Sequence, residues 1–194
     1  QLKGVILTLA VIDFGTISVN IAFYSFAFDT LKVTSSYWGL LISILYGMNL
    51  ISMIFLMLYK ERFRKHPVAI AGLLMASVSA VWIFYSMTYN RTYILAGAAT
   101  EGFCLSLCNT LLVTYLLESA RKEYTARVIG IRDLLSYSAK LIGIGFTYLL
   151  MVFFGAGIVF ISSAAIVLIF TVYKAINYSG SGAKPKRADR IKAT

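Results

Sequence analysis

Charged residues are scarce in this sequence, and their scarcity excludes a soluble fold. Asp, Glu, Lys and Arg make up 13% of the 194 residues, whereas hydrophobic residues make up 59%, and the mean hydropathy is +0.80. Soluble domains carry about 25% charged residues. A chain of this length could bury a core in water, but such a core does not need long apolar runs that recur from one end to the other. These runs require lipid as their solvent.

The sequence also lacks the motifs that would indicate an enzyme. It has one histidine and two cysteines, with no glycine-rich phosphate loop, no histidine cluster and no nucleophile elbow. We therefore expect no catalytic activity and no cofactor. Cys104 and Cys108 lie in one apolar run and, with Glu101, offer only a weak metal-ligand spacing. Interior packing explains both thiols better, so no metal site is predicted.

Acidic residues are fewer than basic ones, and this imbalance has a membrane interpretation. The chain carries 18 Lys and Arg against 8 Asp and Glu, a formal net charge of +10. Because the basic residues lie between apolar runs and near the C-terminus, we interpret them as charges that set topology and face anionic lipid. We expect no nucleic-acid partner. The chain begins with Gln and not Met, so we expect it to be processed, trimmed or cut from something longer.

Long apolar runs dominate the rest of the sequence. A helix needs about 20 predominantly apolar residues to cross the hydrocarbon core of a bilayer, and six runs meet this requirement. The sequence therefore predicts an all-α polytopic membrane protein. The expected spans are Val5–Ala27, Trp38–Tyr59, Pro67–Tyr89, Tyr93–Leu117, Leu134–Phe154 and Ala156–Tyr173.

The distribution of Lys and Arg between the spans predicts the orientation. Fifteen of them fall at the N-terminus, in the second and fourth loops and near the C-terminus, whereas Lys32 and Arg91 fall on the opposite side and Lys140 lies within the fifth span. Positive charge favours the cytoplasmic side, so both termini should be cytoplasmic. We expect residues 1–176 to form the six-helix bundle and residues 177–194 a basic, disordered cytoplasmic tail. The plasma membrane is the expected location.

Three ionisable side chains, Asp13, Glu101 and Lys140, fall within the apolar spans. Each would cost about 2.5–3.5 kcal/mol on insertion scales, so each requires a partner or a water-filled cavity. An ion pair between Lys140 and either Asp13 or Glu101 would relieve this cost. Such a pair would be a permanent link between helices or one that a solute or proton breaks, and the sequence leaves both open.

Polar residues in the first span share one helix face. Asp13, Thr16, Asn20 and Tyr24 follow one another at spacings of three or four. This face either lines a polar pathway or packs against another polar helix. In the fourth span Asn109 lies beside the run that contains Glu101. The predicted solute or ion pathway residues are Asp13, Asn20, Tyr24, Glu101, Asn109 and Lys140.

Two loops carry a resemblance to a known family. The segment from Glu118 to Gly130, with Arg127 near its end, resembles the loop between the fourth and fifth helices of the major facilitator superfamily. The segment from Tyr59 to Lys65 is similar to a degenerate form of that family's signature between helices two and three. The glycines of that signature are missing, the fourth span has no arginine, and the fifth has no Gly-Pro pattern. These departures resemble the second, C-terminal half of a family member more than the first half.

The resemblance implies one six-helix half of a secondary active transporter. Such a protein moves a small solute by alternating access, coupled to protons or sodium, between two six-helix halves. The second half would be part of the same polypeptide, a separate chain or another copy of this chain. A non-transporting scaffold subunit of a larger membrane complex is the alternative. The residues expected in cytoplasmic gating or anchoring contacts are Glu61, Arg62, Arg64, Glu118 and Arg127.

Overall fold

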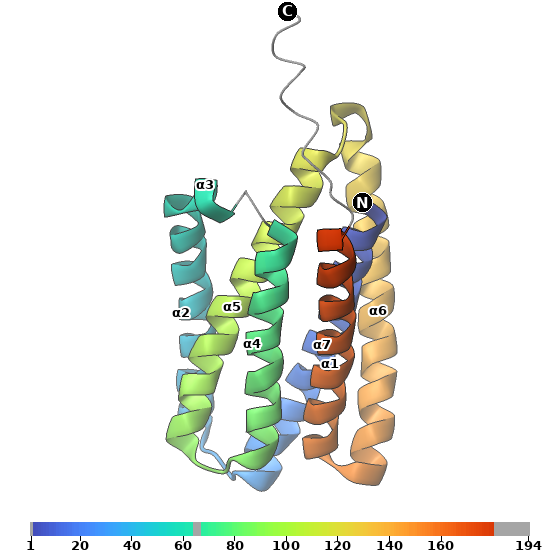
Figure 1. The fold of residues 1–194 in the computed structure, drawn as a ribbon. Helices are drawn as coiled ribbons and strands as arrows, with labels where there is room; N and C mark the ends of the chain where they lie inside the picture. Colours follow the sequence, from blue (N-terminus) through green and yellow to red (C-terminus); the bar gives the residue numbers. More distant parts are fainter. Residues whose placement is uncertain (1, 64–66, 181–194) are drawn as a thin grey trace, which may run out of the picture.

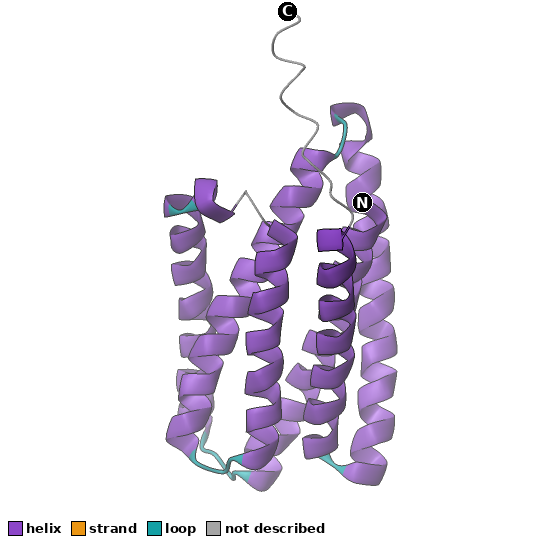
Figure 2. Ribbon diagram, viewed as in Figure 1, coloured by secondary structure: helices purple, strands orange, loops and turns teal. Residues whose placement is uncertain are grey.

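The described part of the chain is built from helices. The computed structural model describes residues 2–63 and 67–180, and within these ranges the regular elements are all helical (Figure 1, Figure 2). Six helices there are long and apolar enough to cross a membrane, which confirms the predicted fold class. They are α1 (Leu2–Ser25) with its π-helical continuation η1 (Phe26–Thr30), α2 (Ser35–Leu58), α4 (Pro67–Met87), α5 (Arg91–Ser119), α6 (Thr125–Phe154) and α7 (Ala156–Gly180).

Some helices extend beyond the apolar runs that predicted them. Helix α6 begins at Thr125 and not at Leu134, because the charged residues in its first turns end the hydrophobic run without ending the helix. Helix α7 continues to Gly180, beyond the predicted end of the bundle at residue 176. Residues 181–194, the remainder of the predicted tail, lie outside the described part of the chain.

Local sequence signals fix the turns at one end of the bundle. The Thr34 side chain accepts a hydrogen bond from the backbone N–H of Tyr37 and caps α2, and the Asn90 side chain caps α5 through the N–H of Thr92. Between α6 and α7 the chain turns at Gly155, whose φ of +80° suits a residue without a Cβ. The short helices α3 (Lys60–Phe63) and η2 (Lys122–Tyr124) occupy connections at the other end, where the N-terminus also lies (Figure 1).

The packing order of the helices reveals an internal repeat. Neighbouring helices follow the order α2, α5, α4, α7, α1, α6 (Figure 1). If α1, α2 and α4 are exchanged in turn with α5, α6 and α7, the same packing order is obtained in reverse. The first three spans and the last three are therefore packed in equivalent ways. Inverted repeats of three plus three helices within each six-helix half are a known feature of secondary transporters. Helices α1 and α5 occupy equivalent positions in this arrangement.

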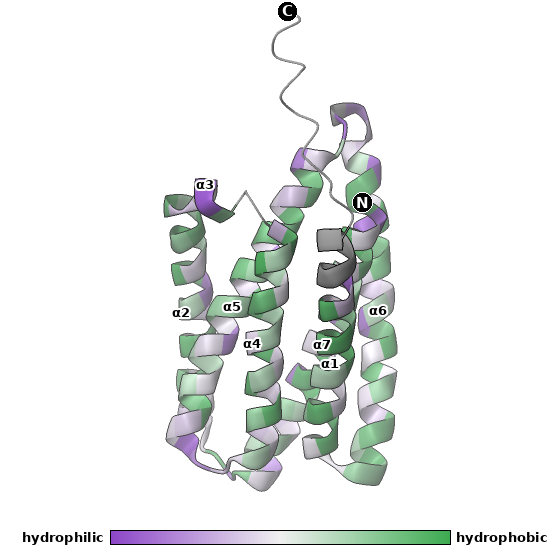
Figure 3. Cartoon of the chain, in the orientation of Figure 1, coloured by the Kyte–Doolittle hydropathy of each residue, from purple (hydrophilic) through white to green (hydrophobic). Residues whose placement is uncertain are grey.

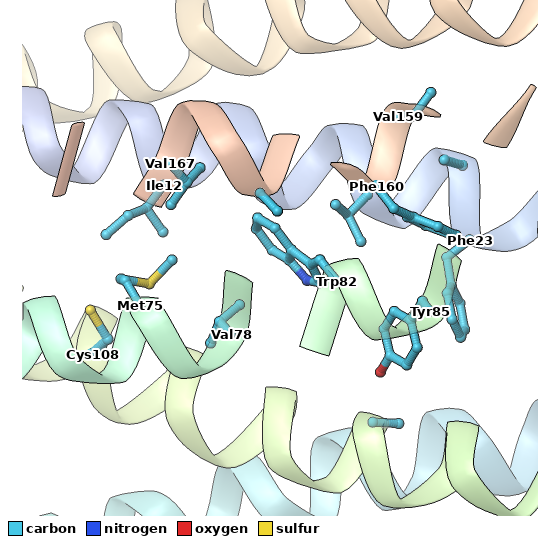
Figure 4. Close-up of a cluster of buried hydrophobic side chains, with 14 of the residues drawn as sticks. Ile12, Phe23, Met75, Val78, Trp82, Tyr85, Cys108, Val159, Phe160 and Val167 are labelled. Atoms are coloured by element: carbon cyan, nitrogen blue, oxygen red, sulfur yellow. The ribbon is translucent and has the colours of Figure 1, made fainter. Parts of the chain in front are cut away.

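The core lies where α1, α4, α5 and α7 meet, and aromatic rings fill one part of it. Trp82, Tyr85 and Phe160 are fully buried, and the ring of Phe23 lies 4.9 Å from that of Tyr85, centroid to centroid. Figure 4 shows these side chains between α1, α4 and α7, with the hydroxyl of Tyr85 directed toward α5. This cluster fixes the position of Tyr85, which matters for the site described below.

The two helices at the ends of the packing order are left largely uncovered. Only 11% of the apolar window in α2 and 11% of that in α6 is buried, compared with 56% for the first span. Figure 3 shows hydrophobic colour along the spans and hydrophilic colour at α3 and at several connections. The uncovered faces of α2 and α6 are apolar, as contact with lipid or with another membrane protein requires. Which end faces the cytoplasm stays a prediction.

Candidate functional site

A cavity opens between α1, α2 and α5, with one residue of α4 in its wall. Its volume is about 380 Å³, within the range of small-molecule sites. Four of its lining residues, Thr16, Asn20, Asn49 and Glu101, bring polar groups to membrane depth. The aromatic side chains in the wall are Phe23, Tyr24, Trp38, Tyr46 and Tyr85.

Glu101 is the charged residue of this cavity, and two neutral donors hold its carboxylate. The indole Nε1–H of Trp82 donates to Oε1 at 2.7 Å, and the hydroxyl of Tyr85 donates to Oε2 at 3.0 Å. Only 5% of Glu101 is exposed. Among the side chains that the structure describes, no lysine or arginine forms an ion pair with it. Hydrogen bonds therefore stabilise the carboxylate without neutralising it.

Close packing of α2 against α5 shapes the cavity wall beside Glu101. Gly102 lies against the backbone of Leu45, and a Cβ at Gly102 would overlap the carbonyl oxygen of Leu45. The absence of a side chain thus lets the two helices approach closely next to the carboxylate. Asn49, one turn further along α2, then reaches the same cavity.

A second polar site lies between α1 and α6. The Lys140 ammonium is 3.6 Å from Oδ1 of Asp13, and the two side chains are 40% and 17% exposed. Oδ2 of Asp13 is buried and has no hydrogen-bond partner among the described residues. The Lys140 ammonium also lies 5.5 Å from the centre of the Tyr137 ring. Of the two partners expected for Lys140, the structure thus provides Asp13.

The predicted pathway residues separate into these two sites. Asn20, Tyr24 and Glu101 line the cavity, whereas Asp13 and Lys140 form the ion pair outside its wall. Although Asp13 shares the α1 face of Asn20 and Tyr24, it lies nearer the N-terminal end of that helix, beyond the cavity wall. Asn109 is exposed on α5 and is not among the lining residues.

The residues expected in gating contacts lie toward the end that carries the N-terminus. Glu61 and Arg62 are exposed on α3, and Arg127 is exposed near the start of α6. Glu118 lines a second cavity, of about 340 Å³, between α2, α4 and α5. Arg64 lies outside the described residues. The gating role of these side chains stays a prediction.

Sequence reasoning missed the partners of Glu101. Trp82 and Tyr85 are spaced three residues apart in an apolar span, and each carries a polar atom that needs a hydrogen-bond partner when buried. This spacing was the sequence signal that could have indicated an acceptor on a neighbouring helix. Within the described part of the chain, Glu101 and the two thiols do not form a group that could hold a metal ion. Cys108 is buried, with its sulfur 3.7 Å from the carbonyl oxygen of Ala71. This contact agrees with a packing role for Cys108.

Comparison with known proteins identifies the family. No curated protein and no solved structure matches this chain. The family profile described as Major Facilitator Superfamily matches residues 5–192, and members of that family are membrane transporters rather than enzymes. With the six apolar helices, this match confirms the resemblance carried by the two loops. The chain belongs to the major facilitator superfamily.

Proposed function

We propose that this chain is one half of a secondary active transporter, and that the cavity between α1, α2 and α5 is its share of the solute pathway. The observation that carries the proposal is Glu101, a carboxylate that has no counter-ion among the described side chains and lies in the wall of a cavity of about 380 Å³. Glu101 lies about 15 Å along α5 from Arg91, well inside the span. A charge at that depth is costly and marks a functional site by default.

The uncovered faces of α2 and α6 support the presence of a second half. These helices form the two ends of the packing order and expose large apolar side chains such as Ile54 and Leu141. Family members place two six-helix halves around a central cavity. The second half is the rest of a longer polypeptide, a separate chain or a second copy. The degenerate loop signatures favour this chain as the C-terminal half.

The ion pair between Asp13 and Lys140 supplies a link that transport can break. It joins α1 to α6 across 3.6 Å, and Lys140 is 40% exposed on its side chain. A proton or sodium ion at Asp13 would weaken the attraction and allow α6 to move relative to α1. We therefore assign coupling to this pair and solute binding to the cavity. The charged residues Arg62, Glu118 and Arg127 would then bridge the two halves when the pathway closes at that end.

An uptake measurement tests the proposal. The chain is reconstituted in vesicles, alone and with any second half that its gene encodes, and uptake of a panel of small solutes is measured under an imposed proton or sodium gradient. We expect gradient-dependent uptake. Glu101→Gln and Asp13→Asn should each reduce it without reducing the amount of folded protein, because both replacements keep the shape of the side chain.

One observation favours a scaffold as the second candidate. Both oxygens of Glu101 accept hydrogen bonds from fixed aromatic donors, as in a permanent link between α4 and α5. A scaffold predicts no uptake of any solute, and it predicts that Glu101→Gln lowers folded protein as much as it lowers any activity. These two results together would contradict the transport proposal and support a scaffold role.

A further inference from the structure

The charge pattern of the cavity distinguishes between classes of solute. Glu101 is the one carboxylate among the lining residues, and no lysine, arginine or histidine lines the wall, all of which the structure describes. The other polar groups are amides, hydroxyls and the indole N–H of Trp38, all of them neutral. When Glu101 is ionised, this wall carries a net negative charge, which attracts a cation and repels an anion.

Glu101 also lacks, in the part of the chain that the structure describes, the cationic partner that a buried carboxylate normally has. Its hydrogen bonds come from an indole and a phenol, and both donors are neutral. Buried charges in proteins are usually paired with an opposite charge or a metal. A bound cation would complete this pairing from the cavity side, because Glu101 forms part of the wall.

Aromatic rings surround the same space. The rings of Tyr24 and Trp38 meet edge to face with centroids 5.5 Å apart, and Phe23 lies 6.1 Å from Trp38. Tyr24 and Tyr46 are 57% and 61% exposed. Ring faces attract organic cations, and aromatic cages are a recurrent way to bind alkylated ammonium groups. A carboxylate combined with such rings suits a cation that is partly apolar.

We propose that the cavity selects an organic monocation, with the charged nitrogen near Glu101 and the apolar part against the rings of Tyr24 and Trp38. This inference rests on the proposed use of the cavity as the solute site and adds the class of solute. It does not depend on transport itself, because binding can be measured without a gradient.

The two tryptophans of the chain make the test direct. Trp38 lines the cavity and Trp82 donates to Glu101, and the sequence contains two tryptophans in all. The chain is placed in lipid nanodiscs and titrated with benzyltrimethylammonium, while tryptophan fluorescence is recorded. Phenylmethanesulfonate, which carries the same ring and the opposite charge, is the matched probe. We expect a saturable signal with the cation and none with the anion over the same concentration range.

Variants connect the signal to the carboxylate. Glu101→Gln should weaken binding of the cation roughly tenfold or more, because a close charge pair contributes at least that factor, while Glu101→Asp should retain most of it. Thr100→Val is the matched control, since Thr100 is the neighbouring residue on α5, is exposed and does not line the cavity. It should leave binding unchanged. If Glu101→Gln does not fold, the comparison of the cationic and anionic probes on the unaltered chain still tests whether the cavity selects a cation.

The outcomes separate this inference from the proposed function. Equal binding of both probes, preference for the anion, or full cation binding by a folded Glu101→Gln variant would overturn the inference. Gradient-driven uptake of anionic or neutral solutes alone would also overturn it while leaving the transport function intact. Selective cation binding without any uptake would support the inference and count against transport.

Discussion

The hydrogen bond between Tyr85 and Glu101 gives a prediction that can be worked out from the structure. Tyr85→Phe removes one hydroxyl and leaves the ring, which is fully buried against Phe23 and Phe160. The lost bond, at 3.0 Å, ends on a carboxylate oxygen. Packing is unchanged by this substitution, so its effect on stability reports the hydrogen bond alone.

The expected magnitude follows from the charge of Glu101. A hydrogen bond to a charged group contributes about 1.5–3 kcal/mol, compared with about 0.5–1.5 kcal/mol between neutral groups. Tyr85→Phe should therefore lower the free energy of unfolding by about 1.5–3 kcal/mol. In a Glu101→Gln background the same substitution should cost about 1 kcal/mol less. The glutamine keeps an acceptor for Trp82, so the indole contact survives in both backgrounds.

A double-mutant cycle measures this difference. The free energy of unfolding is obtained for the unaltered chain, the two single variants and the double variant, by titration of mixed micelles with SDS and detection by tryptophan fluorescence. A coupling energy near zero would refute the reasoning, because it would mean that Tyr85 does not bond to a charged carboxylate. An unaltered stability in Tyr85→Phe would mean that water in the cavity replaces the hydroxyl.

Two further predictions concern the contacts between helices. Gly102→Val should lower the free energy of unfolding by about 1–3 kcal/mol through overpacking against Leu45. Gly47→Val, at a position where a Cβ meets open space, should change it little. Equal effects of the two substitutions in the same SDS titration would contradict the close approach of α2 and α5. Lys140→Asp should abolish uptake, because it places two carboxylates together. Adding Asp13→Lys restores opposite charges and should recover part of the uptake. If uptake by the double variant is no higher than that of Lys140→Asp alone, the ion pair is not the coupling element.

The fold was largely readable from the sequence because one physical requirement dominates it. Every span must satisfy its backbone within lipid, so the apolar runs between charged loops predicted the six helices. The start of α6 was not predicted, because Arg127, Arg132 and Asp133 end the apolar run without breaking the backbone hydrogen bonds of the helix. Hydropathy reports which residues face lipid, and helix ends depend on backbone geometry as well.

The candidate site was only partly readable. The cost of ionisable groups in lipid pointed to Asp13, Glu101 and Lys140, and all three have partners in the structure. What the sequence did not show is which helices adjoin each other. Trp82 meets Glu101 because α4 packs against α5, and no periodicity within a single helix contains that information.

The internal repeat explains why the polar groups fall into two sites. Asp13 and Glu101 each lie about three turns into their helices, and α1 and α5 are equivalent in the packing order. Because α1 packs against α6 and α5 packs against α2, the two equivalent positions adjoin different helices. One carboxylate then meets Lys140 on α6, while the other meets the cavity beside α2.

Water access to the cavity is the measurement that tests the central claim most directly. A cysteine is introduced by Asn20→Cys after Cys104 and Cys108 are replaced by alanine, and its reaction with a membrane-impermeant thiol reagent is followed in nanodiscs. We predict a rate comparable to that of Lys32→Cys in the exposed connection between η1 and α2. Reaction as slow as that of Ser79→Cys, at a fully buried position, would show a closed interior and contradict a solute pathway.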